Sequence, residues 1–209
     1  MDIPKYPVIF FKPTTAITGP CDPIFVPSVC QIHPPAKVDY EVELVIVIGK
    51  EGKDIPVNKA HEYIMGYTIG NDVSQRTWQM ERGGTQFGVG KMFDTFAPIG
   101  PAIVSASSLD NTSNLRIYSK VNNDIRQDSN TSDMIFNCNE VVSFMSIGTT
   151  LRPGDLIFTG TPSGVAVGLN PPPYLKDGDE VFFHIDKIGI LKNKVIFENP
   201  DQSIVELYT

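Results

Sequence analysis

Hydrophobic residues along the chain occur mostly in short runs separated by Gly, Pro, Asn and Asp, a pattern typical of β-strands joined by turns. The runs predict strands over residues 7–11, 43–49, 96–105, 114–122, 155–160, 179–185 and 188–198. Residues 176–181, after the stiff proline run 171–173, resemble the turn of a β-hairpin. The pattern therefore predicts a mainly β protein with few helices.

Two segments have an apolar spacing closer to that of a helix. Residues 58–72 place Ala60, Ile64 and Tyr67 at i, i+4 and i+7. Residues 131–148 begin with a Ser/Asp N-cap signal before an apolar pattern of period near 3.6. Both predicted helices are short. Because no repeat, low-complexity tract or linker interrupts the sequence, residues 1–209 are predicted to form one domain.

Composition excludes several classes of partner. The chain has 209 residues, 41% of them hydrophobic, which is enough for a substantial core. Its net charge of −7 argues against nucleic acid or an anionic membrane, because both reward clustered Lys and Arg. No apolar run approaches the roughly 20 residues that span a bilayer. We therefore expect no nucleic-acid partner and no membrane partner.

The cysteines and the first residues bear on location. Cys21, Cys30 and Cys138 are odd in number and have no C-x-x-C spacing, which predicts neither a disulfide framework nor a structural zinc site. The stretch MDIPKYPVIFF has an acid and two prolines where a signal peptide needs a basic start and an apolar core. The expected location is the cytoplasm or the mitochondrial matrix, with no targeting segment visible.

Two carboxylates stand beside the strand predicted at residues 43–49, where a core strand tolerates little charge. Glu41 and Glu43, in DYEVEL, are at i and i+2, so their side chains leave one face of a strand about 7 Å apart. Asp72 follows an apolar, glycine-containing segment, where an unpaired charge is again costly. An isolated E-x-E is more often a solvated rim. Three carboxylates without Cys or His nearby instead favour Mg²⁺ or Mn²⁺ with positions left for a substrate.

Two other stretches could meet an anion at such a site. Lys91 lies between a glycine pair and an aromatic segment, so its ammonium is predicted to enter a pocket and face a substrate carboxylate or an enolate. The alternative is a lysine that extends from a strand to water. The Gly/Thr/Pro/Ser loop over residues 159–168 could bind a carboxylate through N–H groups and hydroxyls, although it matches no phosphate-binding fingerprint.

Five motifs taken in order resemble the fumarylacetoacetate hydrolase family, specifically its short members built around the C-terminal-type catalytic domain. They are FFKP, DYEVEL, GYTIGNDVSQRTWQ, GKMFDTFAPIGP and PGDLIFTGTPSGV, and the resemblance runs from about Pro7 to about Phe197. It implies a mixed β-sandwich roll, usually a homodimer, that binds Mg²⁺ or Mn²⁺ and acts on a small 2-oxo acid.

The resemblance also implies roles for residues at matching positions. Metal ligands are implied at Glu41, Glu43 and Asp72. Catalytic groups, which contact the substrate or support the metal ligands from behind, are implied at Lys91, Arg76 and Gln79. Substrate contacts are implied at Lys12, Gln127 and Thr161. The family's N-G-x-x-x-Q motif has Asn123 here in place of Gly, which predicts a differently shaped loop.

One family segment has no counterpart in this sequence. Members that hydrolyse acylpyruvates usually begin with G-x-N-Y-x-x-H-x-x-E, a lid whose His and Glu activate water. None of the three histidines, His33, His61 and His184, has a Glu three places on. We therefore expect a catalytic domain that lacks the lid, and structural roles for His61 and His184.

The reaction that the resemblance implies is C–C bond cleavage of a 2-oxo acid, by acylpyruvate hydrolysis or oxaloacetate decarboxylation, through an enolate stabilised by the metal and Lys91. A general base for water is commonly worth ~10²–10⁴ in rate, so its loss weakens hydrolysis more than decarboxylation. Two alternatives stay open. One is an isomerase or tautomerase of oxo-dienoates or oxaloacetate, which still needs a proton shuttle. The other is a lidless, non-catalytic homologue that binds metal and oxo acid.

Overall fold

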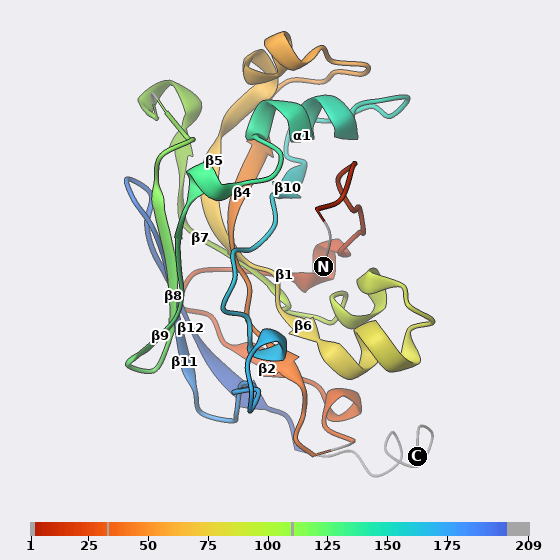
Figure 1. Ribbon diagram of the computed structural model, residues 1–209, viewed down its shortest axis with the longest axis vertical. Helices are drawn as coiled ribbons and strands as arrows, with labels where there is room; N and C mark the ends of the chain where they lie inside the picture. The colour runs from red at the N-terminus through yellow and green to blue at the C-terminus, as the bar shows by residue number, and fades with distance from the viewer. Residues whose placement is uncertain (1–2, 33, 110, 200–209) are drawn as a thin grey trace.

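The computed structural model describes residues 3–32, 34–109 and 111–199, and within these ranges it contains two five-stranded sheets and a two-stranded ribbon (Figure 1). The first sheet has the order β1-β7-β5-β4-β10, the second has the order β2-β12-β11-β8-β9, and β3 pairs with β6. The strands are β1 (Ile17–Thr18), β2 (Ile24–Val26), β3 (Val38–Asp39), β4 (Val42–Ile48), β5 (Ile64–Asn71), β6 (Ser74–Gln75), β7 (Ala97–Ser105), β8 (Arg116–Val121), β9 (Asp124–Asn130), β10 (Leu156–Phe158), β11 (Glu180–Ile185) and β12 (Gly189–Phe197).

The helical elements of the described residues are short. They are the α-helix α1 (Cys138–Met145), the π-helix η4 (Trp78–Arg82), and the 3₁₀ helices η1 (Thr14–Ala16), η2 (Ser28–Cys30), η3 (Val57–Tyr63), η5 (Phe87–Gly90), η6 (Ala106–Ser108), η7 (Thr131–Asp133) and η8 (Ala166–Gly168). In the part of the chain that the structure describes, no helix has the length and apolar character of a membrane span.

The two large sheets share one apolar core. Its buried members include residues of β4, β5 and β10 in the first sheet and of β2, β8, β11 and β12 in the second. All seven residues of β4 are buried, whereas β11 alternates between buried and half-buried positions, so only one face of β11 meets the core. Most strand pairs are antiparallel, but β1–β7 and β2–β12 are parallel. The mainly β, mixed β-sandwich roll predicted above is confirmed.

Six of the seven predicted strands are present, and the seventh, over residues 7–11, is wrong. That segment lies outside every sheet. Within its apolar run, the Phe10 ring packs against the Phe87 ring, with centroids 6.3 Å apart. The neighbouring Phe11 is 80% exposed. Figure 1 shows the N-terminal residues beside segment 78–92, on the side of the molecule away from the second sheet.

The predicted helix over residues 58–72 is wrong in its second half. The chain forms η3 as far as Tyr63 and then β5, which pairs with β4 and β7. Ile64 and Tyr67 therefore owe their spacing to burial on a central strand and not to a helical face. Aromatic and β-branched residues at Tyr67, Thr68 and Ile69 fit such a strand.

Two other local predictions need correction. The helix over residues 131–148 begins later, at Cys138, where Asn137 and Glu140 form a capping box. The Ser/Asp signal at its start belongs instead to η7. Residues 176–179 do form a turn, with the Lys176 N–H donating to Asp179 at 2.8 Å, but the turn leads into β11 and joins no hairpin.

Candidate active site

Strands β4 and β5 bring three carboxylates together at one end of the first sheet. Val42 pairs with Asn71, and the Asp72 N–H donates to the Glu41 carbonyl at 3.0 Å, so Asp72 lies across from Glu41. Ligand-type oxygens of Glu41, Glu43 and Asp72 all lie within 4.8 Å of one another, and all three residues are buried. Such a group could hold a metal ion, and we name it the carboxylate cluster.

Two lysines enter the carboxylate cluster from different segments. Lys91 Nζ donates to Asp72 Oδ2 at 2.6 Å, to Glu41 Oε2 at 3.1 Å and to Ser74 Oγ at 2.6 Å. Lys12 Nζ donates to the other Asp72 oxygen, Oδ1, at 2.6 Å. The Lys91 ammonium therefore lies among the carboxylates and does not extend to water, because this side chain is almost completely buried.

Glycine at position 90 permits this approach of Lys91. A Cβ added at Gly90 would lie 2.6 Å from the Gln75 carbonyl oxygen and 2.6 Å from Gln79 Cβ, closer than real Cβ atoms come. The end of η5 therefore packs directly on the segment that carries Gln79. Above the lysine, the Phe10 ring centroid lies 4.9 Å from Lys91 Nζ.

The charges in the cluster shift its pKa values in opposite directions. Burial, with Asp72 and Glu41 adding to it, raises the pKa of Glu43 well above its ordinary value. Burial also opposes the charge on Asp72, but Lys12 and Lys91 outweigh it and lower the pKa of that carboxyl. For Lys91, burial is outweighed by Asp72 and Glu41, which raise the pKa, whereas burial dominates for Lys12 and lowers its pKa.

Glu43 provides the test of whether the cluster suits a cation. Its Oε2 accepts the Gly160 N–H at 2.7 Å, and no ion pair between Glu43 and a described Lys, Arg or His side chain is present. A buried carboxylate beside two others and without a cationic partner is costly. A divalent cation with oxygen ligands would relieve that cost, so the donor set fits Mg²⁺ or Mn²⁺.

Arg76 and Gln79 lie behind the cluster. Arg76 Nη2 donates to Glu41 Oε1 at 2.6 Å, Nη1 donates to Gln79 Oε1 at 2.7 Å, and Nε donates to Asp39 Oδ2 at 2.9 Å. Burial lowers the pKa of the guanidinium, but Glu41 and Asp39 outweigh it, so the pKa is raised. The structure thus joins Arg76 to a metal-ligand candidate.

Gln127 and Thr161 meet on the second sheet's side of the cluster. Gln127 Nε2 donates to Thr161 Oγ1 at 2.7 Å, and the Thr161 hydroxyl donates to the Val42 carbonyl at 3.0 Å. The loop predicted to differ in shape is a two-residue turn between β8 and β9, in which Asn122 has a φ of 55°. It still places Gln127 against Thr161.

Sequence reasoning missed three members of the site: Asp39, Ser74 and Phe10. Asp39 is completely buried and touches Arg76, and Ser74 accepts a hydrogen bond from Lys91. The available signal was their placement inside DYEVEL, NDVS and FFKP, the same stretches that carry the ligands and lysines.

Two of the histidines, His61 and His184, and all three cysteines lie outside the carboxylate cluster. His61 is exposed in η3, His184 stacks on Tyr118 with ring centroids 4.8 Å apart, and His33 is outside the described residues. The three cysteines are free, with Cys21 exposed and Cys30 and Cys138 buried.

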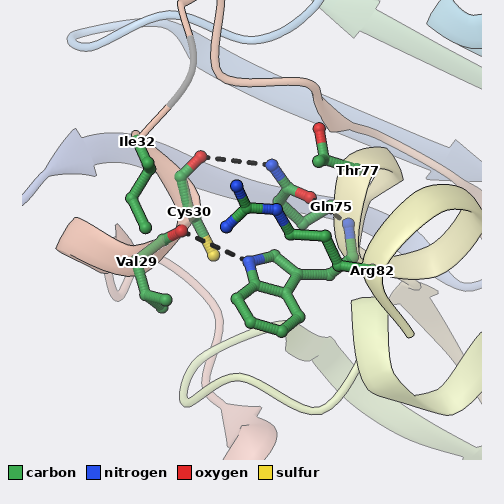
Figure 2. A pocket seen from close by; sticks show the side chains of 7 residues that line it. Val29, Cys30, Ile32, Gln75, Thr77 and Arg82 are labelled. Atoms are coloured by element: carbon green, nitrogen blue, oxygen red, sulfur yellow. Dashed lines mark hydrogen bonds between the residues drawn. The ribbon is translucent and has the colours of Figure 1, made fainter. Parts of the chain in front are cut away.

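Two hollows elsewhere on the described surface are separate from the cluster. Figure 2 shows the smaller one, about 10 Å³, which is lined by Val29, Cys30, Ile32, Gln75, Thr77, Trp78 and Arg82. A cavity of that size holds about one water molecule and no substrate. Hydrogen bonds close it, from Gln75 to the Cys30 carbonyl at 3.1 Å and from Trp78 to the Val29 carbonyl at 3.2 Å. The larger, about 540 Å³, lies around Pro171–Pro173 and Phe197.

Comparison with known proteins assigns this arrangement to a known fold. Residues 1–196 match the family model described as fumarylacetoacetate (FAA) hydrolase, C-terminal. The chain is 47% identical over 194 residues to "Oxaloacetate tautomerase FAHD2A, mitochondrial" of Bos taurus, covering 93% of this chain and 60% of that protein. It is 47% identical over 204 residues to the "Fumarylacetoacetate hydrolase domain-containing protein 2 homolog" of Dictyostelium discoideum, covering 93% and 65%. It thus spans less than two thirds of these relatives.

Solved structures agree with the fold. The 5-carboxymethyl-2-hydroxymuconate delta-isomerase from Mycobacterium smegmatis superposes with a TM-score of 0.83 at 42% identity, covering 95% of this chain and 72% of that one. A fumarylacetoacetate hydrolase from Exiguobacterium antarcticum gives a TM-score of 0.84 at 38% identity, covering 91% and 66%.

Proposed function

The chain belongs to the fumarylacetoacetate hydrolase family, and on that premise we propose that it is a divalent-metal-dependent enzyme that interconverts the enol and keto forms of oxaloacetate or a close 2-oxo acid. The observation that carries the proposal is the carboxylate cluster, buried and held by two lysines. Two kinds of relative support the reaction class. A curated relative is named an oxaloacetate tautomerase, and a solved one is named a delta-isomerase, and both names describe the movement of a proton.

Glu41, Glu43 and Asp72 would hold the metal, with Mg²⁺ or Mn²⁺ as the candidates. When bound, such an ion supplies positive charge against the 2-oxo and carboxylate oxygens of a substrate. The raised pKa of Glu43 agrees with this assignment, because a cation close to a buried carboxyl favours its ionised form.

The protein's own groups then act on the charge that develops when the C3 proton passes to water and before water returns a proton to the 2-oxo oxygen. Lys91, protonated and fixed by three acceptors, places a positive charge beside Glu41 and Asp72, where it stabilises negative charge on the substrate oxygen. Lys12 is less buried than Lys91 and donates to Asp72 at 2.6 Å and to the Val73 carbonyl at 3.4 Å, so its third N–H group can orient a carboxylate. Thr161 and the loop around it would contact the carboxylate that the substrate presents.

Decarboxylation of oxaloacetate is the second candidate. Loss of CO₂ from C3 leaves the same enolate charge as loss of a proton, so the same lysines would stabilise it. The two reactions differ in product, because only decarboxylation releases pyruvate. Measuring pyruvate on one preparation of the protein therefore distinguishes the two reactions.

The test is an oxaloacetate assay with Mg²⁺, Mn²⁺ or EDTA, on the wild type and Asp72→Asn. Enol absorbance follows tautomerisation, and a coupled lactate dehydrogenase reaction follows pyruvate, with uncatalysed decay subtracted. We expect metal-dependent loss of enol absorbance, abolished by Asp72→Asn. Pyruvate release at an equal rate would favour decarboxylation. Retention of metal with neither reaction would refute both and leave a non-catalytic binding homologue.

We also propose that the chain forms one domain and works as a homodimer, in the mitochondrial matrix or the cytoplasm. The single core shared by both sheets supports one domain. Apolar side chains of the N-terminal segment, Ile3, Tyr6, Val8 and Phe11, are between 59% and 80% exposed, which supports a face covered by a second copy. Light scattering during gel filtration tests this, and a monomer at micromolar concentration would refute the dimer.

A further inference from the structure

We infer that Asp39 is a positioning residue: its carboxylate fixes Arg76 and, through Arg76, sets the place of Glu41 in the carboxylate cluster. The inference rests on the proposed metal-dependent function, since it assigns Glu41 to a metal. Its test is metal binding, which does not depend on the reaction that follows.

Asp39 has the bonding of a structural anchor and not of a ligand. Its Oδ1 accepts the N–H groups of Tyr40 at 2.8 Å and Ala166 at 2.7 Å. Its Oδ2 accepts the Val167 N–H at 2.9 Å and Arg76 Nε at 2.9 Å. The residue has no exposed surface, so these four donors take the place of water. Both oxygens are thereby occupied, and the carboxylate can act on the site only through its partners.

Arg76 carries the effect of Asp39 to the ligand. The guanidinium is planar, so the bond from Nε to Asp39 Oδ2, with Nη2 also 2.8 Å from that oxygen, fixes the direction of the remaining N–H groups on Nη1 and Nη2. Those groups donate to Glu41 Oε1 at 2.6 Å and to Gln79 Oε1 at 2.7 Å. Glu41 is thus held on one oxygen by Arg76 and on the other by Lys91. The rotamer of this ligand follows from the orientation of Arg76.

The loop over residues 160–167 contacts Glu43 directly and is linked to Glu41 through Asp39 and Arg76. At its start, the Gly160 N–H donates directly to Glu43. At its end, Ala166 and Val167 donate to Asp39, which reaches Glu41 through Arg76. Asp39 therefore links the placement of the loop, including Thr161, to the placement of a metal ligand. Groups that orient metal ligands in this way typically contribute 10–100-fold to affinity.

The test compares Mn²⁺ dissociation constants, measured by calorimetry on the metal-stripped full chain. The variants are Asp39→Asn, Arg76→Lys, the double variant and Asp128→Asn. Asp128 forms a two-point pair with Arg116 at 2.9 and 2.8 Å on an exposed surface, so its variant removes the same chemistry away from the site. Arg76→Lys keeps the positive charge but loses the planar guanidinium with its several N–H donors, so it tests the geometry of the Arg76 contacts and not the net charge.

We expect Asp39→Asn and Arg76→Lys each to weaken Mn²⁺ binding by about 10–100-fold. The double variant should bind Mn²⁺ about as weakly as the single variant with the lower Mn²⁺ affinity, because both changes act on one contact. Asp128→Asn should bind like the wild type. The non-additive result is the signature of Asp39 acting through Arg76.

Three outcomes would overturn the inference. The first is an Asp39→Asn protein that melts earlier but binds Mn²⁺ with wild-type affinity, since Asp39 would then be structural only. The second is full additivity in the double variant. The third is wild-type affinity in Arg76→Lys, which decides the matter even where Asp39→Asn does not fold. Weakened Mn²⁺ binding in a protein whose wild type leaves oxaloacetate unchanged would support Asp39 and refute the proposed reaction.

Discussion

Replacing Lys91 by Met separates the two effects of this buried cation. The lysine makes ion pairs of 2.6 Å with Asp72 and 3.1 Å with Glu41 at 3% side-chain exposure. Removing one partner of a buried pair typically costs 3–5 kcal/mol. At 2–4 °C per kcal/mol for a domain of this size, the metal-free variant should melt about 6–20 °C below the wild type.

Metal binding and turnover should then move in opposite directions. The variant leaves the carboxylates with one positive charge fewer, and two unit charges about 5 Å apart interact by about 3 kcal/mol at an effective dielectric constant of 20. We expect Mn²⁺ affinity to rise by at least about tenfold, and Mn²⁺ to restore part of the lost melting temperature. Oxaloacetate turnover should fall by about 10²–10³, the usual cost of losing one group that stabilises an oxyanion.

The assays are differential scanning calorimetry, Mn²⁺ titration and enol absorbance on one preparation. Lys192→Met is the control, because Lys192 pairs with Glu180 at 2.9 Å while 44% exposed, and such pairs contribute at most about 1 kcal/mol. A tenfold loss of Mn²⁺ affinity in Lys91→Met would refute the reasoning. It would mean that the lysine mainly positions the ligands and does not compete with the cation.

Three further predictions follow from contacts and pKa shifts. Gly90→Ala should lower turnover at least about tenfold, because its Cβ would displace the Gln79 segment beside Lys91. Its melting temperature should change less than that of Lys91→Met. Kinetics and melting curves check this, and full activity would contradict it. Mn²⁺ affinity should still rise with pH above the ordinary titration range of a glutamate, by at most about tenfold per unit, because the raised pKa of Glu43 keeps its proton competing with the metal; a flat profile by titration there would be inconsistent with that competition. A thiol reagent should label Cys21 alone in the native protein and all three cysteines in denaturant, since burial raises the pKa of Cys138 to about 11; rapid native labelling of two thiols would show the burial to be wrong.

Much of the fold was predictable because strands in this chain have local signals. Apolar runs bounded by turn residues located β4, β7, β8, β10, β11 and β12. The helix prediction over residues 58–72 failed because the strand in its second half has no clear local signal. β5 is buried on both faces, so it lacks alternation, and its Ile64–Tyr67 spacing imitates a helix. The prediction for Pro7–Phe11 failed because the segment pairs with no strand: Phe10 packs on Phe87, while Val8 and Phe11 are exposed.

The residues of the site were predictable to the extent that they share short motifs. Spacing placed Glu41 and Glu43 on one side of the chain, and β4–β5 pairing then added Asp72. The spacing of residues could not predict contacts between residues that are far apart in the sequence. Asp39 meets Ala166 across 127 positions, and Lys12 meets Asp72 across 60, so those links depend on the tertiary fold.

The two ammonium groups in the cluster bear on how a metal ion would enter it. Lys12 and Lys91 each form a 2.6 Å ion pair with Asp72, one on each oxygen. A divalent ion bound by Asp72 would share those oxygens with the lysines or take their place. Entry of the ion would then be an exchange of cations. Lys12, whose side chain is 10% exposed against 3% for Lys91, would be the easier of the two to move.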